Sequence, residues 1–293
     1  MTDVIMGSIT GLTWPQIRPY AVSLSLCGFE GEKVLFVNKI DSAARQKLQA
    51  LNFNLIDFEL PPEFEGRSCD SQTDVAAWTA FGYARYQPAI EFLKSRNDLR
   101  YVVWADVRDV IFQTDPMEWI ASHIGDKPII TAREGWTIEN QPHNAAWMQY
   151  TAPEDWDEMR TEEVLCAGTV AGTADGIRRL FERISEKLQT VDPRANDQGI
   201  FNWVLRQETF DEDYWIPRLC LGFVVTGWPH KIFLPYAYST DDRPVFNASD
   251  YVAYTPDGET PFCIVHQYDR DTQWRRAIEA IMETTEQSLL KGI

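Results

Sequence analysis

Short apolar runs alternate with longer amphipathic segments over the first half of the chain, which predicts alternating β-strands and α-helices. Such alternation favours a mostly parallel sheet with helices on its faces. Pro88 lies inside one of the predicted helices and should kink it or split it in two. The predicted strands are residues 3–9, 33–38, 54–58, 101–105 and 128–132, and the predicted helices are 15–27, 42–51, 74–96 and one starting at 115.

The second half of the chain is less regular. Residues 134–163 are rich in Trp, Asn, Pro and acidic side chains, and they predict a long loop or lid with one short helix at most. No internal repeat or linker is visible, so a single α/β domain over residues 1–293 is expected. The further predicted elements are a strand and turn at 164–172, helices at 173–189, 196–206 and 271–290, and short strands at 221–226, 251–254 and 262–265.

Two aspartates directly follow the apolar strand at 101–105. Asp106 and Asp109 are expected at the carboxyl end of that strand, where open α/β sheets bind their ligands. Two carboxylates suit Mg²⁺ or Mn²⁺, and such an ion can hold a diphosphate. The alternative is a turn in which an aspartate caps the following residues.

Three later segments carry further candidate chemistry. The small residues 166–172 permit close approach of a ligand to the backbone, or a tight strand–helix connection. The polar residues 196–198 begin a helix, either as ordinary caps or as a carboxylate and an amide that face a substrate. His266 ends a short apolar strand and is either a structural histidine or a third metal ligand.

Charge and cysteine content restrict the class of protein. The net charge of −17 argues against nucleic acid or an anionic membrane as a partner. The five cysteines are scattered and form no CxxC pair, which indicates a reducing compartment without structural zinc. The first residues lack the basic and apolar regions of a signal peptide, and no run is long enough for a membrane span. A cytoplasmic protein is therefore expected.

Taken together and in their order, these segments resemble the GT-A glycosyltransferases. The likeness is greatest to the family-eight retaining enzymes, which include glycogenin and bacterial lipopolysaccharide galactosyltransferases. It spans residues 73–274 and departs from the pattern at three places: the acidic motif is D-x-x-D, a cysteine replaces an asparagine, and a lysine after the histidine is missing. The matching segments are 83–86, 104–112, 166–168, 197–202 and His266 with Trp274.

The resemblance implies a single GT-A (Rossmann-like) domain whose mixed, mostly parallel central sheet is flanked by helices. Residues 1–132 form the nucleotide-binding half, 133–270 the donor-sugar and acceptor half, and 271–293 a C-terminal helix. The implied activity is metal-dependent transfer of a sugar from a nucleoside diphosphate sugar, a UDP-sugar, to a glycan or small-molecule hydroxyl acceptor, with retention of configuration.

The resemblance also implies roles for individual residues. The metal, Mn²⁺ or Mg²⁺, is assigned to Asp106, Asp109 and His266. The donor is assigned to Arg85, Asp106, Gly168 and Arg270, with Arg275 as the alternative to Arg270 at the diphosphate. Gln198 steadies the reacting sugar centre, and Asp197 lines the sugar or, in an inverting enzyme, acts as the base. Residues 134–163, with Trp136, Trp147 and Trp156, cover the donor or bind the acceptor by stacking on sugar faces.

Two other functions remain open at this point. A sugar-1-phosphate nucleotidyltransferase uses a similar sheet but is expected to carry a basic, glycine-rich loop after its first strand. Residues 7–13 contain glycines and no basic residue, which disfavours that class. A non-catalytic carbohydrate-binding protein with an acidic, tryptophan-rich surface is the other alternative.

Overall fold

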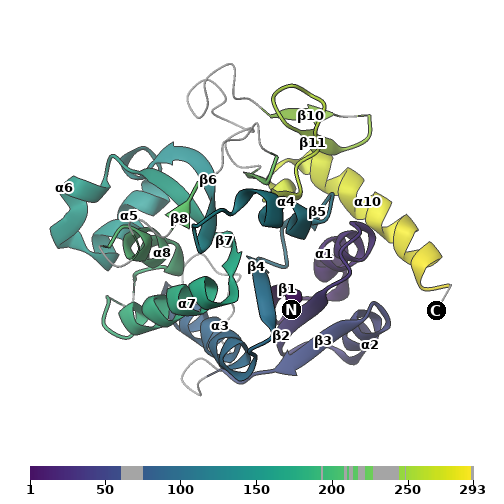
Figure 1. The fold of residues 1–293 in the computed structure, drawn as a ribbon, viewed down its shortest axis with the longest axis horizontal. Helices are drawn as coiled ribbons and strands as arrows, with labels where there is room; N and C mark the ends of the chain where they lie inside the picture. Colours follow the sequence, from purple (N-terminus) through teal and green to yellow (C-terminus); the bar gives the residue numbers. More distant parts are fainter. Residues whose placement is uncertain are drawn as a thin grey trace.

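A seven-stranded mixed sheet forms the centre of the protein, with strand order β3-β2-β1-β4-β7-β6-β8 (Figure 1). The computed structural model describes residues 1–60, 75–192, 194–207, 210, 214–216, 222–226, 244–247 and 249–291, and for 75–83 and 215 the backbone alone. Strand β7 is antiparallel to both of its neighbours, and the other pairings are parallel. The expected mixed, mostly parallel α/β sheet is therefore confirmed. The strands are β1 (Thr2–Thr10), β2 (Glu32–Asn38), β3 (Phe53–Asp57), β4 (Leu99–Ala105), β6 (Ile129–Thr137), β7 (Glu163–Thr173) and β8 (Tyr214–Trp215).

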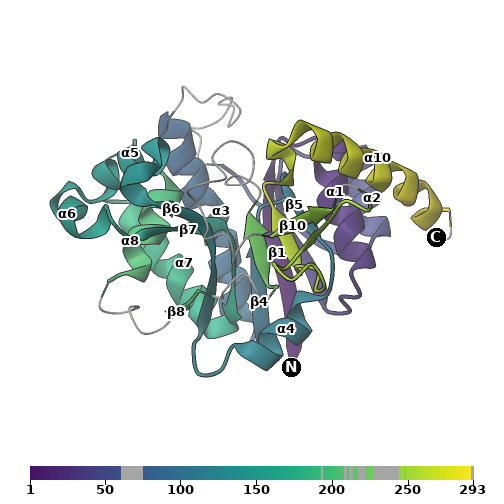
Figure 2. The same cartoon turned by 90° about the horizontal axis from the view of Figure 1, so that it is seen from above.

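Helices cover both faces of this sheet (Figure 2). Strand β4 shows why its sequence is apolar without interruption: Val103 and Ala105 pack on one face, whereas Val102 and Trp104 pack on the other. The first face is covered by α1 (Trp14–Leu26), α2 (Ser42–Ala50) and α4 (Pro116–His123), and the second by α3 (Val75–Ser95), α7 (Ala174–Leu188) and α8 (Asp197–Leu205).

A second, three-stranded sheet lies beside the first and has the order β5-β12-β9. Strand β12 (Ile264–His266) pairs antiparallel with β5 (Val110–Phe112) and parallel with β9 (Val224–Thr226). Strand β5 was not predicted, because three apolar residues after an acidic turn are too few to give a strand pattern. A separate pair consists of β10 (Val245–Asn247) and β11 (Val252–Tyr254).

The prediction of a long loop or lid over residues 134–163 is wrong. Strand β6 continues to Thr137, a 3₁₀ turn follows at Ile138–Asn140, and α5 runs from Pro142 to Thr151. The side chain of Gln141 accepts a hydrogen bond from the backbone of Asn144, and Pro142 occupies the first turn, so α5 begins with an ordinary capping arrangement. A second 3₁₀ turn (Pro153–Asp155) and α6 (Trp156–Met159) complete the segment.

Helix α3 runs from Val75 to Ser95 without interruption, so Pro88 does not split it. Burial of Ala89, Ile90 and Leu93 against the sheet offsets the hydrogen bond that the proline cannot donate.

The C-terminal helix α10 (Thr272–Leu289) packs along α1 (Figures 1 and 2). Its buried Glu286 accepts a hydrogen bond from the indole of Trp14 at 3.0 Å and pairs with Lys47 at 2.7 Å, which fixes the helix to α1 and α2. Among the residues that the structure describes, no helix has both the length and the apolar character needed to cross a bilayer.

Candidate active site

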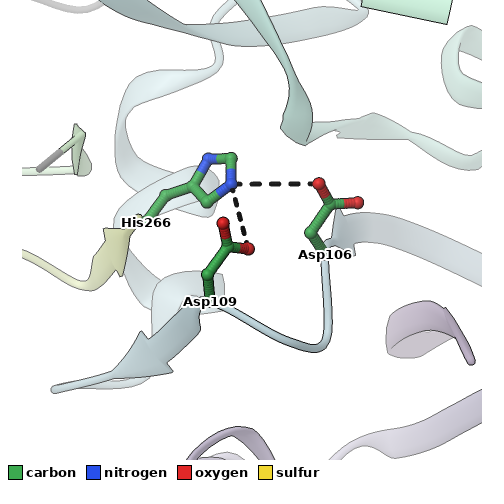
Figure 3. Close-up of side chains that lie close together, drawn as sticks. All are labelled: Asp106, Asp109 and His266. Carbon is green, nitrogen blue, oxygen red and sulfur yellow. Dashed lines mark ion pairs between the residues drawn. The ribbon is translucent and has the colours of Figure 1, made fainter. Parts of the chain in front are cut away.

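Two neighbouring aspartates and a histidine that is distant in sequence meet at the carboxyl end of β4 (Figure 3). Asp106 follows β4, Asp109 precedes β5, and His266 is the last residue of β12. The Nε2 atom of His266 lies 3.5 Å from Oδ1 of Asp109 and 3.9 Å from Oδ2 of Asp106. One potential ligand atom from each residue lies within 4.8 Å of the others.

Two backbone pairings bring these residues together. In the small sheet, His266 is paired with Val110, which places it beside Asp109 in the neighbouring strand. On the other side, the backbone N–H of Asp106 donates to the carbonyl of Gly168 at 2.8 Å and so fixes the end of β4 against β7. The geometry of the cluster is therefore set by two sheets rather than by a flexible loop.

Burial and mutual charge perturb all three groups. His266 is 2% exposed, and although burial opposes its charged form, Cys166 and Asp109 raise the pKa of its imidazole well above the ordinary value. Burial alone would raise the pKa of Asp109, but the charge of His266 and its hydrogen bond, with help from Arg270, lower it to about 2. Burial raises the pKa of Asp106, because the nearby charge of Arg85 offsets that effect only in part.

The donor set fits a divalent cation. Two carboxylates and one imidazole suit Mn²⁺, and Mg²⁺ accepts the same oxygens. Space for an ion depends on Gly168, because a Cβ atom there would lie 2.6 Å from Oδ2 of Asp106 and 2.8 Å from Nε2 of His266. Among the common residues, only glycine leaves the area between these two groups open.

Arg85 connects the cluster to the start of α8. Its guanidinium lies 3.1 Å from Oδ1 of Asp106 and 2.7 Å from Oδ2 of Asp197. It also donates to the hydroxyl of Tyr86 at 3.0 Å, and that hydroxyl donates to Asp197 at 3.4 Å. Arg85 is only 8% exposed, so this arrangement is largely shielded from water. The role of Tyr86 in it was not predicted.

Gln198 is held against β7 by its side-chain amide. Its Oε1 accepts from the backbone of Ala167 at 2.7 Å, and its Nε2 donates to the carbonyl of Leu165 at 2.8 Å. Asn196 caps α8 by accepting from the backbone of Gln198, so the capping interpretation of this segment is confirmed. Capping by Asn196 leaves Asp197 and Gln198 for other contacts.

Arg270 contacts the second aspartate of the cluster and lies in the 3₁₀ turn Tyr268–Arg270. It lies 3.2 Å from Oδ2 of Asp109 and 2.9 Å from Asp269, and one third of its side chain is exposed. Arg275 is exposed on α10, whereas Trp274 is buried in a small apolar cluster. The structure thus brings together the predicted residues Arg85, Asp106, Asp109, Gly168, Asp197, His266 and Arg270, with Gln198 joined to them through β7.

Two buried groups at the site were missed. Glu134 is 6% exposed and lies 3.5 Å from Nε2 of Gln198, and burial raises the pKa of its carboxyl. It was missed because it lies in the segment that was predicted as a loop. Cys166 lies 3.1 Å from Nδ1 of His266, and burial raises the pKa of its thiol to about 11. The sequence shows a cysteine where the resembled family has an asparagine, but it does not show that this cysteine contacts His266.

Solved structures show the same fold. Two structures of LgtC, one of the active-site mutant Q189E and one of the galactosyltransferase in complex with donor and acceptor sugar analogues, each match with a TM-score of 0.61. They share 16% and 15% identity, and each alignment covers 96% of this chain and 95% of the other. The bifunctional glycosyltransferase WbbM matches with a TM-score of 0.53 and 13% identity, over 90% of this chain and 45% of its own.

A comparison with curated protein sequences gives no significant match. The family of nucleotide-diphospho-sugar transferases, in contrast, matches residues 32–273, which include the whole acidic cluster and the start of α8. The chain therefore belongs to the nucleotide-diphospho-sugar transferase family and is a glycosyltransferase with a GT-A fold that resembles the family-eight enzymes.

Proposed function

We propose that this protein is a metal-dependent retaining glycosyltransferase that moves a sugar from a UDP-sugar to a hydroxyl group of a glycan or small molecule. The observation that carries the proposal is the convergence of Asp106, Asp109 and His266 at the carboxyl end of β4. This is the edge of an α/β sheet at which ligands bind.

We assign the donor to the groups around that cluster. The three side chains hold Mn²⁺ or Mg²⁺ in this proposal, with residues 1–132 as the nucleotide-binding half and 133–270 as the half for the sugar and the acceptor. Arg85, beside Asp106, and Arg270, beside Asp109, supply fork-shaped donors for phosphate or sugar oxygens. Gly168 lets the donor approach the backbone closely.

The bound cation would offset the negative charge that develops on the departing diphosphate. The contribution of the chain is to position the donor and to add further positive charge. Arg85 is fixed between Asp106 and Asp197, so its direction is set before the substrate arrives. Preorganised charge of this kind lowers the barrier without reorganisation during the reaction.

The environment of Asp197 supports retention over inversion. An inverting reaction needs a free base, and Asp197 is the candidate, but its Oδ2 is paired with Arg85 at 2.7 Å. The same oxygen also accepts a hydrogen bond from the hydroxyl of Tyr86 at 3.4 Å, so it is not free to face the hydroxyl of an acceptor. In a retaining reaction the leaving phosphate takes the proton of the acceptor. Gln198 then steadies the positively charged sugar centre through the remaining lone pair of its side-chain oxygen.

Trp147 is our candidate for acceptor stacking. Its ring is half-buried on α5 and stacks on the exposed His143 with 5.7 Å between the ring centroids. The backbone of Trp147 also lies close to Gly199, the residue after Gln198, since a Cβ atom on Gly199 would be 3.0 Å from the Trp147 carbonyl. Trp136 and Trp156, in contrast, pack against an apolar cluster that includes Met148, which favours a structural role for both.

The proposal is tested by incubating the protein with a panel of UDP- and GDP-sugars, with Mn²⁺, with Mg²⁺ or with EDTA. We expect slow hydrolysis of one UDP-sugar with Mn²⁺ and none with EDTA, and ¹H NMR should show that the first sugar released keeps the donor configuration. Equal hydrolysis in EDTA would refute the metal assignment, and an inverted first product would refute retention.

A matched pair of variants links that activity to the cluster. Asp109→Asn keeps the size of the side chain but removes a proposed ligand charge, and it should abolish metal-dependent hydrolysis. Asp115→Asn is the control, because Asp115 caps α4 by accepting from the backbone of Met117, and asparagine caps equally well. Equal activity of the two variants would contradict the assignment of Asp109.

A further inference from the structure

We propose that Cys166 is a positioning residue, whose sulfur fixes the ring of His266 so that Nε2 faces the metal site. This inference rests on the metal site of the proposed function. Both residues are 2% exposed, and Sγ of Cys166 lies 3.1 Å from Nδ1 of His266. The contact is on the side of the ring away from Nε2, the atom that faces Asp106 and Asp109.

The direction of the hydrogen bond follows from what metal binding needs. An imidazole that binds a cation through Nε2 has its lone pair there, and its single proton is then on Nδ1. Nδ1–H donates, and the sulfur of Cys166 accepts. Any residue without an acceptor at this place would leave a buried N–H unpaired and would leave both tautomers available to the ring.

Glu134 extends this arrangement by one group. Cys166 is also hydrogen-bonded to Glu134. Because its sulfur accepts from Nδ1–H of His266, its S–H is left to donate to the carboxylate of Glu134. In many metal sites the histidine ligand donates its second N–H directly to a carboxylate. Here the thiol of Cys166 lies between the imidazole and the carboxylate.

The same geometry separates this role from direct ligation. The sulfur contacts Nδ1, whereas the candidate ligand atoms of the cluster are two carboxylate oxygens and Nε2. Cys166 would have to leave the imidazole to reach the cation. We therefore expect it to act through His266 and not to touch the metal.

Three variants test the proposal by Mn²⁺ affinity, measured by isothermal titration calorimetry. Cys166→Ala removes the acceptor and should weaken Mn²⁺ binding by about 10- to 100-fold, the usual effect of losing a group behind a metal ligand. Cys166→Ser keeps a donor and an acceptor and should restore most of that affinity. Cys263→Ala is the control, because Cys263 is a buried cysteine of the same apolar cluster, 5% exposed, whose thiol is hydrogen-bonded with Thr114.

A second measurement reports the tautomer directly. In ¹⁵N-histidine-labelled protein with Mg²⁺, the nitrogen shifts of His266 should show a protonated Nδ1 in the wild type and in Cys166→Ser. A mixture of tautomers is expected in Cys166→Ala.

Unchanged Mn²⁺ affinity and an unchanged tautomer in folded Cys166→Ala would overturn the positioning role while leaving the metal site in place. A sulfur-to-metal charge-transfer band in the Co²⁺-loaded wild type would overturn it in favour of direct ligation. Absence of Mn²⁺ binding to the wild type would overturn this inference together with the metal assignment of the proposed function.

Discussion

Replacing Gly168 with alanine places a methyl group where His266 and Asp106 face each other. The added carbon would lie 2.6 Å from Oδ2 of Asp106 and 2.8 Å from Nε2 of His266. Optimal contacts are about 3.5–4.0 Å, so one of these groups must retreat by about 1 Å. Metal–ligand distances tolerate changes of only about 0.2 Å. We therefore expect Mn²⁺ to bind at least 100-fold more weakly, a loss of about 2.7 kcal/mol.

The variant should remain folded, because overpacking of this kind costs about 1–3 kcal/mol of stability. Titration calorimetry measures the Mn²⁺ affinity, and urea unfolding measures the stability. Gly172→Ala is the matched control on the same strand: its Cβ would clash with the carbonyl of Pro128, away from the cluster. It should lose stability but keep its affinity for Mn²⁺. A folded Gly168→Ala protein with wild-type Mn²⁺ affinity would refute the proposed position of the ion.

Three further predictions concern other parts of the structure. Glu286→Ala leaves Trp14 and Lys47 without their buried carboxylate and should lower the free energy of unfolding in urea by about 3–5 kcal/mol. Glu283→Ala, which removes an exposed partner of Arg18, should cost less than about 1 kcal/mol, and equal losses would contradict this. Arg85→Lys keeps the charge but loses the planar fork whose two nitrogens reach Asp106 and Asp197, so kcat/KM for donor hydrolysis should fall about 100-fold, and an unchanged value would contradict its role. Burial raises the pKa of the Glu134 carboxyl above its ordinary 4.5. The free energy of unfolding of the wild type should therefore fall as the pH rises from the ordinary pKa through the raised one. Glu134→Gln should therefore have the higher Tm at about pH 8, with the difference closing near about pH 4, and a difference that grows toward acid would refute the assignment.

The strands of the central sheet could be predicted because they are buried on both faces. Strand β4 was predicted at 101–105 and spans Leu99–Ala105, and the predicted strand at 33–38 is β2, Glu32–Asn38. The candidate ligands Asp106 and His266 were found for a related reason. Each is a polar residue at the end of a short apolar strand, a place where α/β proteins often bind ligands, although the two strands belong to different sheets.

The rest depends on contacts that local patterns do not contain. Strand β5 has three residues and exists because it pairs with β12, more than 150 residues later in the chain. The contact between Cys166 and His266 joins residues 100 positions apart. The segment 134–163 has almost no apolar periodicity in its main helix, α5, which is fixed by its cap and by packing on α8. Tertiary contacts override weak local signals at each of these places.

The central claim is that a divalent cation binds between the end of β4, the start of β5 and the end of β12. Crystals grown with Mn²⁺ and UDP, measured at a wavelength where manganese scatters anomalously, test this directly. The account predicts one strong anomalous peak within coordination distance of Asp106, Asp109 and Nε2 of His266, with the diphosphate on its open side. A peak elsewhere, or UDP bound at this edge with no manganese between these residues, would contradict it.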